Sequence, residues 1–186
     1  MNALKAPAIL GLALVLAAPA IVHADTNSAV SVTVGPDLAK KTKSYGAREI
    51  EQIRKDLQQQ VASAVSKSSS PVTRVDVVLE DATPNRPTFA QLGRNVGLSM
   101  ESVGVGGAKM SGVVHTADGR QLPFRYGWYE NDLRNEIGSV TWSDAYRAFG
   151  MLAHRVAKGD LPTSYGPGAK SSGDGDFGNT YGLHRY

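Results

Sequence analysis

The hydrophobic period of this chain changes from helical to extended between residues 44 and 80, and this change most constrains the fold. Residues 44–66 hold apolar side chains at spacings of three and four, the pattern of a helix with one buried face. Five residues form this stripe: Ile50, Ile53, Leu57, Val61 and Val65. Residues 72–80 then alternate, with Val75, Val77 and Leu79 on one side, as in a half-buried strand. The chain must therefore pack an amphipathic helix against a sheet.

A short first strand and a hairpin complete the predicted sheet. Residues 30–34 alternate β-branched and polar side chains before Gly35-Pro36, which predicts a strand that ends in a turn. Residues 100–105 and 108–116 are expected to be extended. The dipeptide Asp118-Gly119 then supplies residues that are preferred in a tight hairpin turn.

The predicted hairpin pairs outward from this turn. Its register sets three residues of the first arm against three of the second: His115, Val113 and Ser111 opposite Leu122, Phe124 and Tyr126, with Trp128 beyond. The aromatic side chains then share one face and pack onto the helices. Pro123 favours an edge position for the second arm, because proline has no backbone N–H to donate to a neighbouring strand.

A second amphipathic helix is predicted after the hairpin. Residues 141–144, Thr-Trp-Ser-Asp, have the spacing of a capping box, and Gly159 with Pro162 ends the element. Its apolar stripe follows at helical spacing: Ala145, Phe149, Leu152 and Val156. The predicted fold class is therefore α+β, a small mixed β-sheet with a β-hairpin and two amphipathic helices packed on one face.

The N-terminal residues have the layout of a cleaved signal peptide. Lys5 precedes an apolar run that ends in Val22-His23-Ala24, with small residues at the two positions that specify cleavage. We therefore expect a signal peptide over 1–24, a periplasmic or secreted location, and no integral membrane span after cleavage. Residues 25–162 are predicted to form a single α+β domain. Residues 163–186, rich in Gly and Ser without an apolar period, are predicted to form a disordered tail.

Composition excludes several classes of chemistry. The chain has no cysteine, so a disulfide scaffold, a thiol nucleophile and a cysteine-built metal site are ruled out. Removal of Lys5 with the signal peptide lowers the net charge from +3 to +2. A surface so nearly balanced lacks the strong basic field that phosphate backbones require, and we expect no nucleic-acid partner.

Three separated segments resemble an uncharacterised group of exported bacterial proteins. They are Asp81-Ala-Thr-Pro-Asn-Arg-Pro-Thr88, the glycine-rich Gly104-Val-Gly-Gly-Ala108, and Thr141-Trp-Ser-Asp-Ala145. The match covers about residues 44–160. The resemblance implies an α+β envelope domain, similar to the sheet-and-helix modules of outer-membrane assembly and transport accessory proteins. It implies no established activity, substrate or catalytic residue.

The polar loop that begins at Asp81 holds most of the candidate binding residues. Long loops inside compact domains are often functional. One hypothesis is a contact surface in which the planar fork of Arg86 binds a carboxylate, a phosphate or an acidic sugar. The other is that Asp81 and Asn85 cap turns internally while Arg86 pairs with an acid. The candidate side chains in this loop are Asp81, Asn85, Arg86, Thr88, Gln91, Arg94 and Asn95.

Other candidate sites are weaker. Trp128 lies near the acids Glu130, Asp132 and Glu136, a combination that can bind sugars, although a polar loop before the last helix with buried aromatic residues explains the pattern better. Asp76 and Glu80 on one strand would be about 13 Å apart, too far for a two-carboxylate hydrolase. No histidine pair has zinc-site spacing. We therefore expect no catalytic residue, cofactor or metal.

The sequence favours a non-enzymatic interaction or assembly-accessory domain of the bacterial envelope. Its predicted contact residues are Asp81, Asn85, Arg86, Thr88, Arg94 and Trp128, and its expected partner is an envelope protein or glycan. The alternative is an envelope glycan-binding protein or hydrolase that uses the 81–95 loop together with Trp128 and Glu130.

Overall fold

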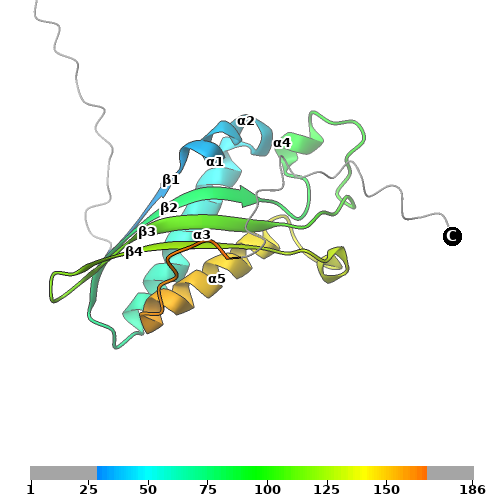
Figure 1. Ribbon diagram of the computed structural model, residues 1–186. Helices are drawn as coiled ribbons and strands as arrows, with labels where there is room; N and C mark the ends of the chain where they lie inside the picture. Colours follow the sequence, from blue (N-terminus) through cyan, green and yellow to red (C-terminus); the bar gives the residue numbers. More distant parts are fainter. Residues whose placement is uncertain (1–28, 167–186) are drawn as a thin grey trace, which may run out of the picture.

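The four strands of the sheet lie side by side in chain order: β1 (Val30–Val34), β2 (Val72–Thr83), β3 (Gly107–Thr116) and β4 (Gln121–Tyr129). β1 and β2 are parallel, and the other two pairs are antiparallel. The computed structural model describes residues 29–166 (Figure 1). The predicted signal peptide, and residues 167–186 of the predicted tail, lie outside the described residues.

Two long helices cover one face of this sheet. α3 (Ala47–Ser66) precedes β2 and α5 (Ser143–Lys158) follows β4, and the two helices lie side by side across the strands (Figure 1). Shorter elements occupy the connections: α1 (Pro36–Lys40), α2 (Thr42–Tyr45), α4 (Phe89–Leu92) and the 3₁₀ helix η1 (Leu133–Glu136). The predicted α+β fold is confirmed, with its mixed sheet, its hairpin and its two amphipathic helices.

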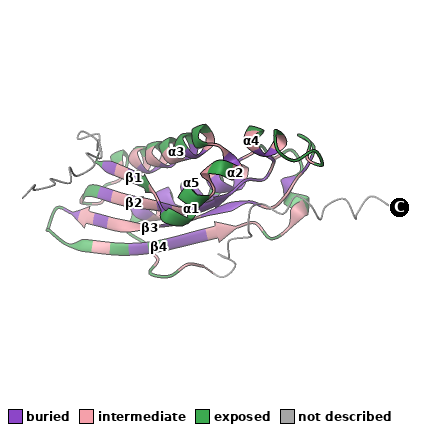
Figure 2. Ribbon diagram, turned by 90° about the horizontal axis from the view of Figure 1, so that it is seen from above, coloured by how far each residue is buried: buried purple, intermediate pink, exposed green. Residues whose placement is uncertain are grey.

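The core lies between the two long helices and the sheet. The predicted stripes are buried there, with Leu57, Phe149 and Leu79 all fully covered. Buried and more exposed residues alternate along the middle of β2, as the colours of Figure 2 show. Each large apolar side chain that is fully buried contributes about 1.5–3 kcal/mol. This burial holds the helices onto the sheet without any disulfide.

The predicted hairpin register is wrong by one residue. Val114 lies opposite Leu122, and Gly112 lies opposite Phe124. The cause is the turn, in which the Thr116 N–H donates to the Arg120 carbonyl at 3.1 Å and so encloses three residues instead of two. Gly119 has φ +82°, the left-handed conformation that such three-residue turns require. The helix-facing position of Phe124 is nevertheless confirmed.

The loop between β2 and β3 also differs from expectation. β2 runs to Thr83, three residues beyond the predicted end, and pairs there with the start of β3. The predicted extended segment 100–105 is not a strand. Its backbone bonds within the loop instead, since the Gly104 N–H donates to the Asn85 carbonyl at 2.8 Å.

Both edges of the sheet are partly covered. On β1, the outward carbonyls of Val30 and Val32 accept hydrogen bonds from Gln58 Nε2 at 3.1 Å and Arg54 Nη1 at 3.2 Å. On β4, the Arg125 N–H donates to the Pro162 carbonyl at 2.8 Å. Edge strands whose polar groups are occupied are poor templates for pairing with another chain. The sheet edges are therefore unfavourable contact surfaces.

Gly112 is expected to tolerate no side chain. A Cβ atom there would lie 2.1 Å from the Asp76 carbonyl and 2.7 Å from the Phe124 ring. We expect Gly112→Ala to lower the free energy of unfolding by about 2 kcal/mol or more, because strand and ring must both shift. Gly97→Ala is the matched control, since nothing lies within 4 Å of the Cβ position there. Equal urea midpoints for the two variants would contradict the observed pairing.

Candidate functional site

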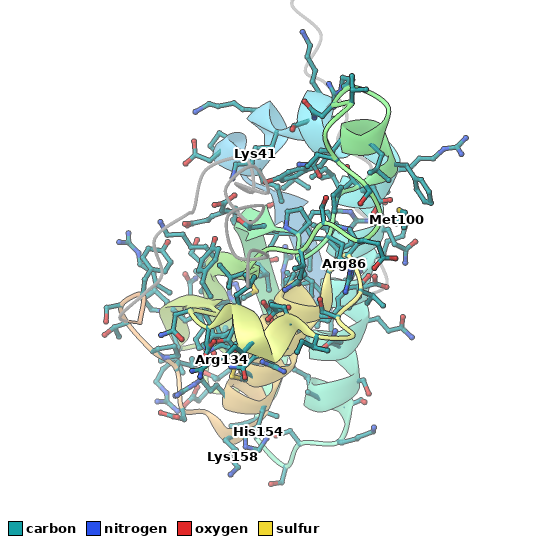
Figure 3. The ribbon with its side chains drawn as sticks, turned by 90° about the vertical axis from the view of Figure 1, so that its right-hand side faces the viewer. Lys41, Arg86, Met100, Arg134, His154 and Lys158 are labelled. Atoms are coloured by element: carbon teal, nitrogen blue, oxygen red, sulfur yellow. The ribbon has the colours of Figure 1, made fainter. Side chains whose placement is uncertain are left out.

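Two loops meet at one end of the molecule, far from the hairpin turn (Figure 1). We call residues 84–106 and 130–142 together the loop end. The Asn85 N–H donates to the Thr141 carbonyl at 2.7 Å, and the Glu130 N–H donates to the Gly106 carbonyl at 3.0 Å. The loop end contains four of the six predicted contact residues, and Figure 3 shows it from the front.

The side chain of Asn85 is fully buried at the centre of the loop end. Its Nδ2 group donates to the carboxylates of Glu136 and Asp144, the latter at 2.5 Å. Its Oδ1 atom accepts the Asp144 backbone N–H at 2.9 Å and so caps the first turn of α5. The predicted capping box over residues 141–144 is therefore wrong, because Asn85 from another loop supplies the cap.

Glu136 and Asp144 form a buried carboxyl pair. Each residue is about 1% exposed, and both bind the same amide nitrogen. The Arg147 guanidinium lies 3.8 Å from Asp144 Oδ1 but also 3.4 Å from Glu130. Burial, together with the nearby Asp144 carboxylate, raises the pKa of Glu136 to about 7. The pair therefore holds a proton near neutral pH, although solvent has almost no access to it.

Asp81 is buried away from the centre of the loop end. Lys41 Nζ lies 2.9 Å from its carboxylate, and the Tyr129 hydroxyl donates to it at 3.2 Å. Burial and this neighbouring carboxylate raise the pKa of Tyr129. Asp81 thus ties β2 and β4 to the segment before α2, and the hypothesis of an internal structural role fits it better than ligand binding.

Thr88 and Arg94 also have structural partners. Thr88 caps α4 in a capping box with Gln91, a signature that the sequence contains and our prediction missed. Arg94 donates to the carbonyls of Ala90 at 3.0 Å and Ser44 at 2.7 Å. These contacts fix α4 against α2.

Arg86 joins the two loops to each other. Its Nε atom donates to the Ser139 carbonyl at 2.5 Å and its Nη1 atom to the Met100 carbonyl at 3.1 Å, and Figure 3 shows Arg86 and Met100 close together. The expected acid partner is absent from the hydrogen bonds and ion pairs of residues 29–166, and carbonyl groups take its place. Arg86 therefore sets the spacing between the loops.

Trp128 lies outside the loop end. It is half-buried on β4 opposite Ala108, and the Arg147 guanidinium lies 5.3 Å from its ring centroid. Glu130 accepts the N–H groups of Asn131 at 2.8 Å and Asp132 at 3.1 Å. Arg147 therefore contacts both Trp128 and Glu130, the latter at 3.4 Å, whereas the side chain of Arg86 bonds to the Ser139 and Met100 carbonyls instead.

Exposed apolar side chains are the feature that sequence reasoning missed. Val96 is fully exposed, Ile137 is 90% exposed and Phe89 is 77% exposed. Within residues 29–166, every exposed large hydrophobic residue lies in the loop end: Phe89, Val96, Met100, Ile137 and Val140. The sequence did contain a signal for them, because these apolar residues stand in otherwise polar loops without the spacing of a helix or a strand. Such clustering makes the loop end a candidate contact surface.

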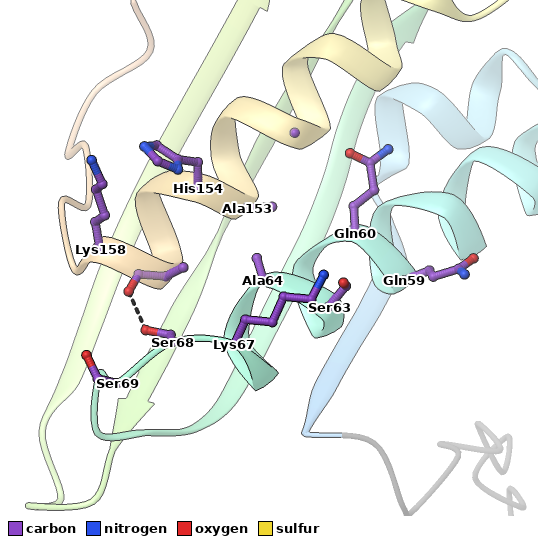
Figure 4. A pocket seen from close by; sticks show the side chains of 12 residues that line it. Gln59, Gln60, Ser63, Ala64, Lys67, Ser68, Ser69, Ala153, His154 and Lys158 are labelled. Carbon is purple, nitrogen blue, oxygen red and sulfur yellow. Dashed lines mark hydrogen bonds between the residues drawn. The ribbon is translucent and has the colours of Figure 1, made fainter.

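A groove between the C-terminal halves of α3 and α5 is a weaker candidate (Figure 4). Ser68 and Ser70 close its end by donating to the Ala157 carbonyl at 2.5 and 2.9 Å. Lys67 and Lys158 lie where both helices end, and cations there complement the helix dipoles. Helix-end stabilisation accounts for these charges without a ligand.

Comparison with protein-family models, curated proteins and solved structures found no match. The resemblance to exported envelope proteins therefore stays a prediction. Within residues 29–166, no cluster of three metal-binding side chains occurs, and no helix combines the length and apolarity needed to cross a bilayer.

Replacement of Glu136 by Gln should remove a pH dependence of stability. Since the pKa of Glu136 is raised from 4.5 to about 7, the folded protein binds this proton more tightly than the unfolded chain. The resulting stabilisation is complete below pH 4.5 and is lost as the pH rises through about 7. Glu136→Gln stays neutral, so we expect it to be more stable than the wild type at about pH 8, by roughly 3 kcal/mol.

Urea denaturation across this pH range measures the effect. Glu101→Gln is the control, because Glu101 is an exposed acid of the same loop end. Parallel stability curves for wild type and Glu136→Gln would show that the pair holds no extra proton.

Loss of the Asn85 amide should destabilise the whole domain. Asn85→Ala removes the amide donor from two buried carboxyl groups and the acceptor of the Asp144 N–H, although Asp144 keeps the Gly106 N–H at 2.9 Å. We expect the free energy of unfolding to fall by about 3 kcal/mol. Asn95→Ala removes one amide bond to the Gln91 carbonyl from an exposed residue, so its expected cost is below about 0.5 kcal/mol. Similar thermal midpoints for both variants would rule out the central role of Asn85.

Proposed function

We propose that this protein is a non-enzymatic interaction domain of the bacterial envelope that contacts another component through its loop end. The observation that carries the proposal is the set of exposed apolar side chains gathered there. A large apolar side chain contributes about 1.5–3 kcal/mol when a partner covers it completely. Coverage of Val96, Ile137 and Phe89 by a partner therefore contributes favourably to binding.

The construction of the loop end supports the same function. Asn85 and Arg86 tie both loops to each other, and Thr88 caps the short helix that Phe89 begins. Loops that are already ordered lose less conformational entropy on binding. The buried polar residues thus act as the support of a surface formed by their apolar neighbours.

The alternative of a glycan-binding protein or hydrolase has less support. Asp81 and Asn85 are buried among internal partners, and Trp128 lies beneath Arg147. A two-carboxylate hydrolase places its acids on either side of a bound sugar. Glu136 and Asp144 instead share one amide group inside the protein.

Site-specific crosslinking in cells tests the contact surface. A photoreactive residue at Val96 or at Ile137 should form adducts with an envelope component, because both side chains project from the loop end. The matched control is Gln121, an exposed residue beside the hairpin turn at the opposite end of the sheet. Adducts no more abundant at Val96 and Ile137 than at Gln121 would overturn the proposal.

A further inference from the structure

We propose that the surface which the loop end contacts is an anionic lipid bilayer. This inference rests on the proposed function and names the chemical class of its partner. It combines the shape of the apolar surface with the charges beside it.

The apolar residues of the loop end project separately. Phe89 begins α4, Val96 and Met100 follow in the same loop, and Ile137 and Val140 lie in the other loop. The intervening residues are largely polar, and Figure 2 shows the loop after α4 mostly exposed. A protein partner would need a matching hollow for each projection. A bilayer interface accepts separate apolar side chains wherever they insert.

The two loops can reach one flat surface together. Both lie at the same end of the molecule in Figures 1 and 2. Arg86 holds the Met100 and Ser139 carbonyls on a single guanidinium group, so the two loops keep a fixed spacing. A rigid pair of projections can insert without prior rearrangement of the fold.

Cations lie in and beside the first of these two loops. Arg94 of the loop end reaches α2 through its bond to the Ser44 carbonyl, and Lys43 and Arg48 are exposed on α2 and on the first turn of α3. No acidic side chain among residues 29–166 forms an ion pair with any of these three or with Arg86. Glu101 is the exposed acid in the same loop.

Apolar insertion with a cationic rim is the chemistry of peripheral binding to anionic membranes. The apolar side chains enter the boundary between headgroups and acyl chains, and the cations attract the negative surface. Because the rim charges are exposed, their attraction weakens as salt increases. Binding should therefore require both features and should be sensitive to salt.

Vesicle cosedimentation of the full chain tests the proposal. We expect binding to phosphatidylcholine vesicles that contain phosphatidylglycerol, with much weaker binding to phosphatidylcholine alone. Val96→Ser/Ile137→Ser should reduce binding by about tenfold or more, because both apolar insertions are lost. Lys43→Gln/Arg48→Gln should reduce binding to anionic vesicles and weaken its salt dependence. All variants share the residues outside 29–166, so differences between them report on the loop end.

Lys67→Gln/Lys158→Gln is the matched charge control at the far ends of the long helices, and it should bind like the wild type. Circular dichroism checks that each variant is folded. Equal vesicle binding by wild type and Val96→Ser/Ile137→Ser would overturn the lipid inference. Crosslinking from Val96 to a protein without any vesicle binding would also overturn it, yet would leave the proposed function standing. Absence of both crosslinks and vesicle binding would overturn both proposals.

Discussion

The side-chain amide of Asn85 binds two buried carboxyl groups and the N-terminus of α5. The positions of both loops of the loop end depend on these bonds. Its Oδ1 atom fixes the start of α5, and its Nδ2 group holds Glu136 beside Asp144. Its backbone bonds hold the segments at Gly104 and Thr141. Within residues 29–166, Glu136 Oε1 has no hydrogen-bond partner of its own, so the Asn85 amide is the hydrogen bond that holds this carboxyl group in place. The loops are thus held together by buried side-chain bonds, although they contain little regular structure.

This arrangement makes the loop end sensitive to protonation. A pair of carboxyl groups in an apolar interior is costly when both are charged. Glu136 belongs to the 3₁₀ helix directly before Ile137, so any repulsion between Glu136 and Asp144 acts on the segment that carries an exposed apolar residue. The stability of the buried contacts that order the surface therefore depends on the ionisation of the pair.

The sequence predicted those parts of the structure in which burial repeats along the chain. Both long helices and the strand before the polar loop have such a period. The predicted hairpin register is wrong because a three-residue turn moves every pairing partner by one position. The role of Asn85 could not be predicted, since its partners lie 51 and 59 residues away and leave no local pattern. Phe89 and Val96 were overlooked because isolated apolar residues in a loop have no period.

The apolar residues of the loop end stand out because the other surfaces have partners. Arg74 and His115 pair with Asp76 on the open face of the sheet, and the Tyr165 hydroxyl donates to Glu80 there at 2.5 Å. Arg54 and Gln58 occupy one sheet edge, and Pro162 accepts a hydrogen bond on the other. These polar groups are paired within the fold, whereas the fold gains nothing from an exposed valine or isoleucine. Apolar side chains that folding leaves exposed remain available for binding. Within residues 29–166, the large exposed apolar side chains all lie at one end of the molecule.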